Sequence, residues 1–281
     1  MAGVPTVLKA ALPSIPGLNQ LPGIRKDPNA DLSSVVETRT ATIDADAVAA
    51  YSRVCEFPAK DTVPLPFPHM LAFPLHMAIL TSPAYPFPAI GSVHVDNVIT
   101  SHRPLHVGET LELSVRAVGP REHPKGTVVD FLADARVGDE LVWESTSTYL
   151  RRGKPHEGAT PGLTFDRIPP GTTQWRLPED LGRRYGAVSG DRNPIHLYPI
   201  TAKALGFPRQ IAHGMWSLAR CVAALENRLP DAVTVEVGFK KPIFLPGTVA
   251  FGLDPAADDL AFALTSPKDG SPHLVGRAVP L

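Results

Sequence analysis

The sequence contains little cysteine and almost no net charge. Cys55 and Cys221 are the only cysteines in 281 residues, too few for a disulfide framework and typical of a protein from a reducing compartment. Both lie in apolar stretches, where we expect small buried side chains. The formal net charge of −1 argues against nucleic-acid binding as a main role, because such proteins usually present a strongly basic face.

Long hydrophobic runs and cofactor motifs are also missing. No apolar stretch reaches the roughly 18 residues that a membrane-spanning helix needs, and the N-terminal segment lacks the pattern of a signal peptide. We therefore expect a cytoplasmic protein without a membrane partner. The sequence has no phosphate-binding GxxxxGK[ST] motif, no Rossmann glycine pattern and no cluster of Cys and His with zinc-site spacing, so we expect no cofactor and no metal.

Proline, by contrast, is abundant. The 31 prolines favour short elements joined by turns over a bundle of long helices. Residues 151–173 are polar, rich in Gly and Pro, and without periodicity, which indicates a linker. We accordingly divide the chain into an N-terminal domain, residues 1–155, and a C-terminal domain, residues 156–281.

The two sides of this linker resemble each other. An apolar segment at 69–81 is followed by several strand-like runs, and so is a second apolar segment at 214–229. The stretch PLHVGETLEL (104–113) has the same pattern as PIFLPGTVAF (242–251). Residues 214–229 are apolar almost all round, as in a helix buried on several sides. We predict an α+β chain with a tandem double hot-dog fold, each half an antiparallel sheet wrapped around a central helix.

One segment concentrates the polar residues that could perform chemistry. Ser189, Asp191, Asn193 and His196 lie within eight positions. Pro194 biases Asn193 away from the helical region, so the segment is predicted to be a shaped loop and not a helix face. Such a loop can direct several polar side chains at one point. Taken singly, Asp191 could be a turn residue and His196 a packed imidazole.

The order of these residues resembles a known family. SGDRNPIH (189–196), followed by AKALGF (202–207) and IAHGM (211–215), is similar to the MaoC-like (R)-specific enoyl-CoA hydratase and 3-hydroxyacyl-thioester dehydratase family. The resemblance implies that Asp191 and His196 hold and activate a water, and that the Gly214 N–H is the oxyanion donor. It implies supporting roles for Ser189 and Asn193. It also implies a two-hot-dog chain whose N-terminal copy has lost the motif.

The chemistry of that family agrees with these residue types. Adding water to an enoyl thioester needs a base for the water and a proton for the α-carbon, which a carboxylate and an imidazole can supply. An N–H at the start of a helix stabilises the enolate-like oxygen. The expected function is the reversible hydration of trans-2-enoyl-CoA to (3R)-3-hydroxyacyl-CoA, or the dehydration, by a hydro-lyase. The (3R) configuration follows from the resemblance alone, and the CoA thioester is the substrate.

Three other functions stay open at this stage. A dehydratase of fatty-acid or polyketide synthesis would take an acyl carrier protein thioester in place of CoA. With either carrier, the chain could form a homodimer. A thioesterase of the same fold would need a carboxylate near the central helix, where only Glu226 is available. A non-catalytic subunit that binds acyl thioesters is disfavoured by the intact pair of Asp191 and His196. The cations that could bind CoA phosphates are Arg183, Arg184, Arg192, Arg209, Lys240 and Lys241.

The first half departs from the second in two ways. Tyr51 matches Tyr185 and His69 matches His213, but the chain between them is shorter in the first half and carries no Asp-x-Asn-Pro-x-His sequence. Pro74 lies inside the first apolar segment and should kink or break its helix. A broken helix would leave room for an acyl chain. We predict an apolar substrate tunnel there, unless these side chains only fill the core; its lining would be Met70, Leu71, Phe73 and Leu75.

Overall fold

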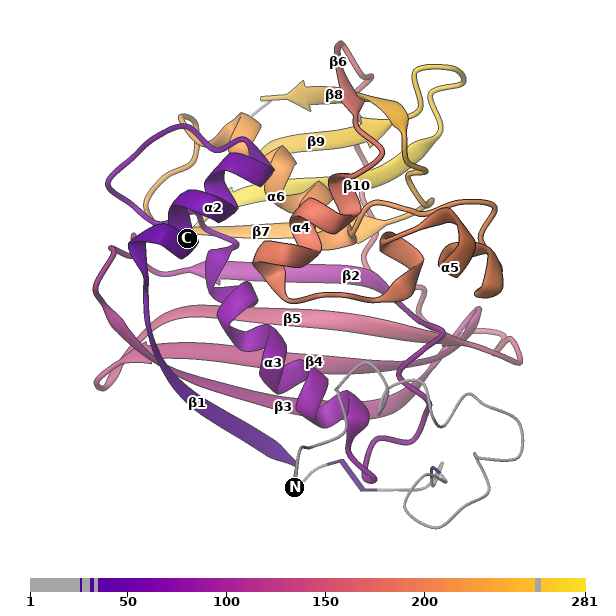
Figure 1. Ribbon diagram of the computed structural model, residues 1–281, viewed down its shortest axis with the longest axis horizontal. Helices are drawn as coiled ribbons and strands as arrows, with labels where there is room; N and C mark the ends of the chain where they lie inside the picture. The colour runs from indigo at the N-terminus through magenta and orange to yellow at the C-terminus, as the bar shows by residue number, and fades with distance from the viewer. Residues whose placement is uncertain (1–25, 27–30, 33–34, 256–258) are drawn as a thin grey trace.

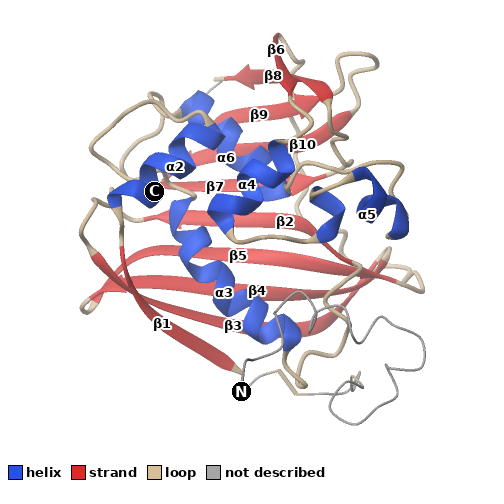
Figure 2. Cartoon of the chain, in the orientation of Figure 1, coloured by secondary structure: helices blue, strands red, loops and turns tan. Residues whose placement is uncertain are grey.

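The computed structural model describes residue 26, residues 31–32, residues 35–255 and residues 259–281. The N-terminal segment in which we looked for a signal peptide lies outside these residues. Ten strands form one antiparallel sheet that curves around the helices (Figures 1 and 2). The strands are β1 (Val36–Thr42), β2 (Ser92–Ser101), β3 (Thr110–His123), β4 (Gly126–Val137), β5 (Glu140–Arg152), β6 (Thr173–Leu177), β7 (Val233–Phe239), β8 (Gly247–Asp254), β9 (Leu260–Thr265) and β10 (Pro272–Pro280).

The order of strands in the sheet repeats. It reads β1-β3-β4-β5-β2 and then, in mirrored sequence, β7-β10-β9-β8-β6. Each half therefore places its first strand at an outer edge and joins the other half through a central strand. The joint is the antiparallel pair β2 and β7, which runs from Asp96 opposite Gly238 to Ser101 opposite Val233. This arrangement confirms the predicted α+β double hot-dog fold. Residue 155 lies in the connection between β5 and β6.

One helix lies across the concave face of each half. The helices are α2 (Ala45–Cys55), α3 (Phe67–Thr81), α4 (Leu181–Ser189), the short 3₁₀ helix η3 (Pro194–His196), α5 (Pro199–Ala204) and α6 (Gly214–Leu225). In Figure 1, α3 crosses the strands of the first half and α6 lies against those of the second. No helix within the described residues is both long and apolar enough to cross a membrane. Cys55 and Cys221 are buried free thiols, as expected.

The central helix of the second half is shorter than predicted. It is apolar on several sides, as the sequence indicated, and nine of its side chains are buried; these are Met215, Trp216, Ser217, Leu218, Ala219, Cys221, Val222, Ala223 and Leu225. It ends at Leu225 and not at residue 229, because the N–H of Arg228 closes a turn on the Leu225 carbonyl. Pro230 also disfavours a helical conformation at the residue before it.

The predicted break in the first central helix is wrong. α3 is continuous from Phe67 to Thr81, with Pro74 inside it and exposed. Pro74 has no N–H to offer the carbonyl of Met70, a loss that typically costs about 3 kcal/mol. Several side chains of α3 are buried, including Ala72 and Ile79, and each large apolar one contributes about 1.5–3 kcal/mol. The free energy gained by burying the faces of α3 that do not contain Pro74 therefore outweighs the missing hydrogen bond.

The halves are held together by their helices as well as by the sheet. α2 of the first half packs on α4 and α6 of the second. The indole N–H of Trp216 donates to the carbonyl of Val54 at 3.0 Å. The rings of Tyr51 and Tyr185, the pair matched in the sequence, lie 6.2 Å apart. These contacts fix α6, and thus its first residue Gly214, relative to the first half.

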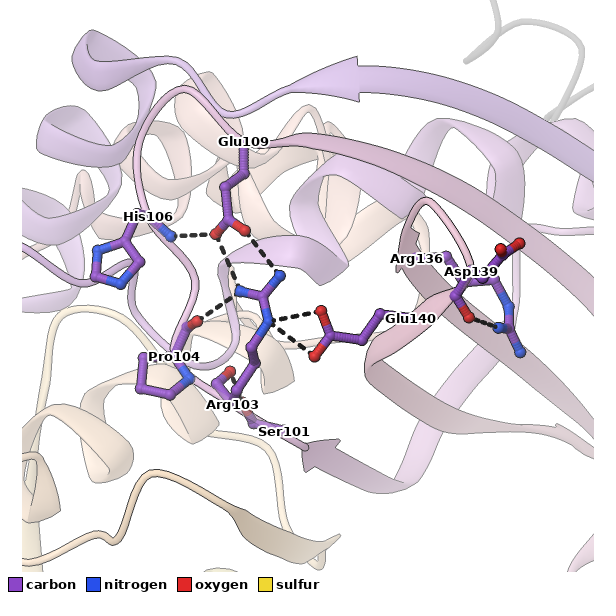
Figure 3. Close-up of polar contacts among 8 residues, drawn as sticks. All are labelled: Ser101, Arg103, Pro104, His106, Glu109, Arg136, Asp139 and Glu140. Carbon is purple, nitrogen blue, oxygen red and sulfur yellow. Dashed lines mark hydrogen bonds and ion pairs between the residues drawn. The ribbon is translucent and has the colours of Figure 1, made fainter.

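In each half, the loop after the central strand bridges to the chain that precedes the central helix. The bridge pairs Thr62 with His106 in the first half and Ile211 with Phe244 in the second. Figure 3 shows the first of these loops, where the Arg103 guanidinium lies between the carboxylates of Glu109 and Glu140. In the second half the N–H of Ala212 donates to the Ile243 carbonyl at 2.9 Å, which fixes the backbone next to the polar loop.

Candidate active site

The polar loop begins where α4 ends. Gly190 terminates the helix in a left-handed conformation with φ 77°, which suits glycine. The N–H of Asp191 then donates to the Ser189 hydroxyl at 3.2 Å, and the N–H of Asn193 donates to the Asp191 carboxylate at 3.1 Å. The Asn193 side chain accepts from the N–H of Ile195 at 3.4 Å and starts η3. Ser189 and Asn193 thus shape the backbone that carries Asp191.

His196 is the last residue of η3 and is buried. Its Nδ1 lies 2.8 Å from the carbonyl oxygen of Ile211. A carbonyl oxygen only accepts, so this nitrogen carries the proton, and Nε2 of the neutral ring is left with a free lone pair. A proton-accepting nitrogen is thereby fixed in tautomer and direction. Gly182 of α4 approaches the backbone of His196 so closely that a Cβ there would overlap its carbonyl.

A second imidazole lies directly against the first. The rings of His196 and His213 stack with centroids 3.7 Å apart. Nε2 of His213 lies 3.0 Å from the backbone carbonyl of Asp191 and 3.8 Å from its carboxylate. The sequence offered no role for His213 beyond packing at the helix start. In the structure it also holds the backbone of Asp191, so it positions the pair.

Burial and the carboxylate set the protonation states. Burial opposes ionisation of Asp191, but His213, His196 and the N–H of Asn193 outweigh it and hold the pKa of this carboxyl below its usual value. Burial lowers the pKa of His196, although Asp191 partly offsets this. Burial and the adjacent His196 lower the pKa of His213 to about 3. Near neutral pH the group is one carboxylate with two uncharged imidazoles.

Gly214 is the first residue of α6, and no side chain caps this helix. Within the described residues its N–H has no protein acceptor, as is usual for the first turn of a helix. A Cβ at Gly214 would lie 3.2 Å from the ring of Phe239, so a larger residue would crowd the site. Gly214, whose N–H lies at the positive end of the helix dipole, lines the same cavity as Asp191 and His196.

The three ionisable side chains could also hold a metal ion. One ligand atom from each of Asp191, His196 and His213 lies within 4.8 Å of the others. Nδ1 of His196 and Nε2 of His213 already face backbone carbonyls. A spacing of this size equally suits a single water bridged between a carboxylate and an imidazole.

A cavity of about 960 Å³ connects the two halves of the molecule. Asp191, His196, His213 and Gly214 form part of its wall, together with Ser189 and Asn193. The volume falls in the range of small-molecule sites. The second-half polar loop and the first-half helix α3 thus face a common space.

The residues predicted to line a tunnel divide into two groups. Met70 and Phe73 line the cavity, joined by Met77 and Leu80, which the sequence did not single out. Leu71 and Leu75 do not line it, and their assignment to the tunnel is wrong. At about 100° per residue they lie on other faces of α3, where they pack in the core.

Of the predicted cations, Arg192, Lys240 and Lys241 line the cavity. Arg183 instead donates to the Leu197 carbonyl, and Arg209 lies over the ring of Phe244. The sequence missed several polar side chains in the wall that come from the first half or from strand ends, far away in the chain; they are His69, His94, Tyr149, Lys125 and Arg152. The repeat that matched His69 with His213 was the one available signal for any of them.

Comparison with known proteins agrees with this geometry. The 3-hydroxyacyl-thioester dehydratase X of Mycobacterium tuberculosis is 37% identical to this chain, over 97% of this chain and 96% of its own length. The chain belongs to the MaoC-like dehydratase family. Residues 157–254 match the family described as MaoC like domain. As a member it is an enzyme of the hydro-lyase class, which confirms the prediction from the motif.

A solved structure and one further relative support the assignment. The crystal structure of HtdX from Mycobacterium tuberculosis matches with a TM-score of 0.77 and 36% identity, covering 87% of this chain and all of that one. The (R)-specific enoyl-CoA hydratase of Aeromonas caviae is 35% identical over 65 residues, which are 22% of this chain and 48% of its own.

The protonation states predict a specific pH dependence. His196 accepts a proton only when neutral, and its pKa lies below 6.5, so kcat/KM should be flat through neutral pH and fall on acidification with a midpoint below pH 6.5. Asp191 stays ionised over this range, so the fall should involve one proton. A midpoint above pH 6.5 or a two-proton limb in a pH–rate profile would contradict the assignment.

Acid unfolding must be measured alongside. His69 and His213 have folded pKa values of about 4 and about 3, below the ordinary 6.5, so the unfolded chain binds more protons in acid. The contribution of these two neutral histidines to the free energy of unfolding is complete above pH 6.5. It declines as the pH falls toward their folded pKa values. Tryptophan fluorescence at each pH separates loss of fold from loss of turnover.

Proposed function

We propose that this enzyme reversibly hydrates trans-2-enoyl-CoA thioesters to (3R)-3-hydroxyacyl-CoA thioesters. The observation that carries the proposal is the proton-accepting Nε2 of His196 beside the ionised Asp191, with the free N–H of Gly214 in the same cavity wall. Lys125, Arg152 and the cavity-lining cations Arg192, Lys240 and Lys241 supply positive charge for the phosphates of CoA.

In the hydration direction, one water lies between Asp191 and His196. Nε2 of His196 takes a proton from this water while its oxygen bonds to C3 of the enoyl group. The double bond shifts toward the thioester, whose oxygen gains negative charge. The resulting imidazolium returns the proton to C2, which balances the reaction as the addition of one water. Asp191 orients the water and stabilises the imidazolium between the two steps.

The oxyanion forms next to the start of α6. The N–H of Gly214 has no competing protein acceptor in the described part of the chain and lies at the positive end of a buried helix. A donor placed where charge develops contributes most to lowering a barrier, typically about a hundred- to a thousand-fold for one hydrogen bond. The tight contact with Phe239 favours glycine at this position.

Thioester hydrolysis is less well supported. Its carboxylate would have to be Glu226, the acid that the sequence offers within the predicted central helix 214–229. Glu226 follows the last residue of α6, is ion-paired with Lys60 at 3.4 Å and does not line the cavity. It therefore cannot reach a thioester held by Gly214.

We further propose that the first half accommodates the acyl chain. The cavity continues from the dyad along α3, where its wall is formed by Met70, Phe73, Met77 and Leu80. These positions recur every three or four residues and so share one face of the helix. An acyl chain that leaves the thioester would follow this apolar stripe.

The stereochemistry of the product is the most direct test of the proposed reaction. Incubation with a trans-2-enoyl-CoA should give the (3R)-hydroxyacyl thioester, as measured by loss of the enoyl absorbance and chiral analysis of the product. The matching carrier-protein thioester, run in parallel, identifies the preferred carrier. A (3S) product, or hydrolysis to free CoA, would contradict the proposal.

Removal of either member of the dyad should abolish most turnover. Asp191→Asn and His196→Gln should each lower kcat by about a hundred- to ten-thousand-fold, because each loses a group that handles the water's proton. The double variant should be little worse than the worse single one, since both residues act on the same water. His102→Gln is the matched control, because His102 pairs with Glu144 on the surface. Near wild-type turnover in either single variant would exclude the dyad.

Narrowing the cavity along α3 should change the chain-length preference. Phe73→Trp and Met77→Trp should lower kcat/KM about tenfold for long acyl chains and spare a four-carbon substrate, because only a long chain reaches these positions. Leu71→Trp serves as the control, since Leu71 lies off the cavity wall. If all chain lengths fell equally in the first two variants, α3 would be only a structural element.

A further inference from the structure

A polar cluster lies between the dyad and the apolar part of the cavity. It consists of His69 from α3, His94 from β2 and Tyr149 from β5, all in the cavity wall. The rings of His94 and Tyr149 stack at 4.8 Å, and those of His69 and His94 lie 6.4 Å apart. The mechanism proposed above uses none of these side chains. We call this group the first-half polar cluster.

The cluster is close to the reacting centre. The ring of His94 lies 5.0 Å from that of Phe239, and a Cβ at Gly214 would lie 3.2 Å from the same ring. The Asp191 carboxylate is near enough to raise the pKa values of both His69 and His94, although burial lowers them to about 4 and about 3. Phe239 therefore neighbours both His94 and the residue proposed to bind the thioester oxygen.

His94 makes a backbone hydrogen bond with Asp96, but part of the hydrogen-bonding capacity of this cluster is not used by the protein. Nδ1 of His69 and Nε2 of His94 are buried, and within the described residues neither has a hydrogen-bond partner. A neutral imidazole needs one acceptor and one donor, and leaving these bonds unmade is costly. Phenylalanine would fill the same space without that cost. His76 also has two buried ring nitrogens without partners in the described residues, so the feature that sets His69 and His94 apart is their place in the cavity wall.

The backbone around His94 is also irregular. The pairing of β2 with β5 shifts register between His94 and Asp96, a bulge that leaves one extra residue in β2. Bulges often redirect a side chain next to an active site. Here the bulge accompanies an imidazole directed at the cavity and a tyrosine directly opposite it.

We propose that the first-half polar cluster binds an oxygen atom, as hydroxyl or carbonyl, that the acyl chain carries a few carbons beyond the reacting double bond. The inference rests on the proposed hydration and names its substrate class: acyl thioesters oxygenated in the chain. A hydroxyl both donates and accepts, which matches neutral imidazoles and a phenol. Farther along α3 the wall turns apolar, with Leu80 about 16 Å from His69 at the rise of a helix, so the rest of the chain is hydrocarbon.

Paired substrates test this inference on the wild-type enzyme. Each plain trans-2-enoyl-CoA is compared with analogues of the same length that carry a hydroxyl or a keto group at one carbon, scanned from about C5 to C9 to cover the reach of the cluster. At one or two adjacent positions the oxygenated analogue should have a kcat/KM about tenfold or more above its plain counterpart. If no position gives a preference, the inference is overturned while the hydration of plain chains still stands.

Variants assign the preference to the cluster. His94→Phe and His69→Phe should each reduce the preference to within about twofold, because phenylalanine keeps the ring and removes the nitrogens. Tyr149→Phe should reduce it partly. His76→Phe is the matched control, since His76 is fully buried, stacks on Phe131 and does not line the cavity.

The two proposals fail in different ways. A preference that survived both His94→Phe and His69→Phe would place the oxygen elsewhere and overturn the inference. Loss of turnover on plain chains in these folded variants would instead assign the histidines to the reaction itself, which also overturns it. If the wild-type enzyme hydrated no enoyl thioester, the proposed function would fail first. Melting curves identify any variant that does not fold. In that case the paired-substrate comparison on the wild-type enzyme decides whether the inference stands.

Discussion

The hydrogen bond from Nδ1 of His196 to the carbonyl of Ile211 is the interaction on which the site depends. It decides which ring nitrogen carries the proton and so gives the site its proton acceptor. Ile211, which carries this carbonyl, is bridged to Phe244 in the loop after β7. The ring of His213 stacks on the imidazole of His196. An imidazole whose pKa is lowered by burial thus becomes a directional base, because hydrogen bonds hold the backbone around it.

The doubled fold explains how such rigidity is compatible with a large cavity. Each half closes its sheet around one helix, and the halves share a continuous sheet through β2 and β7. The second half has a long connection between α4 and α6, which carries η3, α5 and the polar residues. The first half has only a short connection between α2 and α3 and leaves the space above α3 open to the other half. One copy of the fold therefore carries the residues that we propose react, and the other forms the opposite wall of the cavity.

Both halves of the chain bury histidine side chains, which costs free energy of folding. His69, His76, His94 and His213 all have lowered pKa values because burial disfavours their charged forms. In the second half His196 and His213 each face a backbone carbonyl and lie near the Asp191 carboxylate, which offsets much of the cost, although Nδ1 of His213 has no partner in the described residues. In the first half several ring nitrogens remain without protein partners in the described structure. This difference between equivalent regions is the reason to look for a ligand group there.

The sequence by itself determined the repeat, the fold class and the segment that carries the proposed reacting residues. Alternating strands around an apolar helix are local patterns, and Ser189, Asp191, Asn193 and His196 are neighbours in the chain, so their proximity follows from one shaped loop. Only the tertiary structure decided what faces that loop. Pro74 suggested a broken helix, but burial along α3 keeps it continuous, and the helix phase removes Leu71 and Leu75 from the cavity. The convergence of His69, His94 and Tyr149 depends on packing between a helix and two strands, which short-range sequence patterns do not encode.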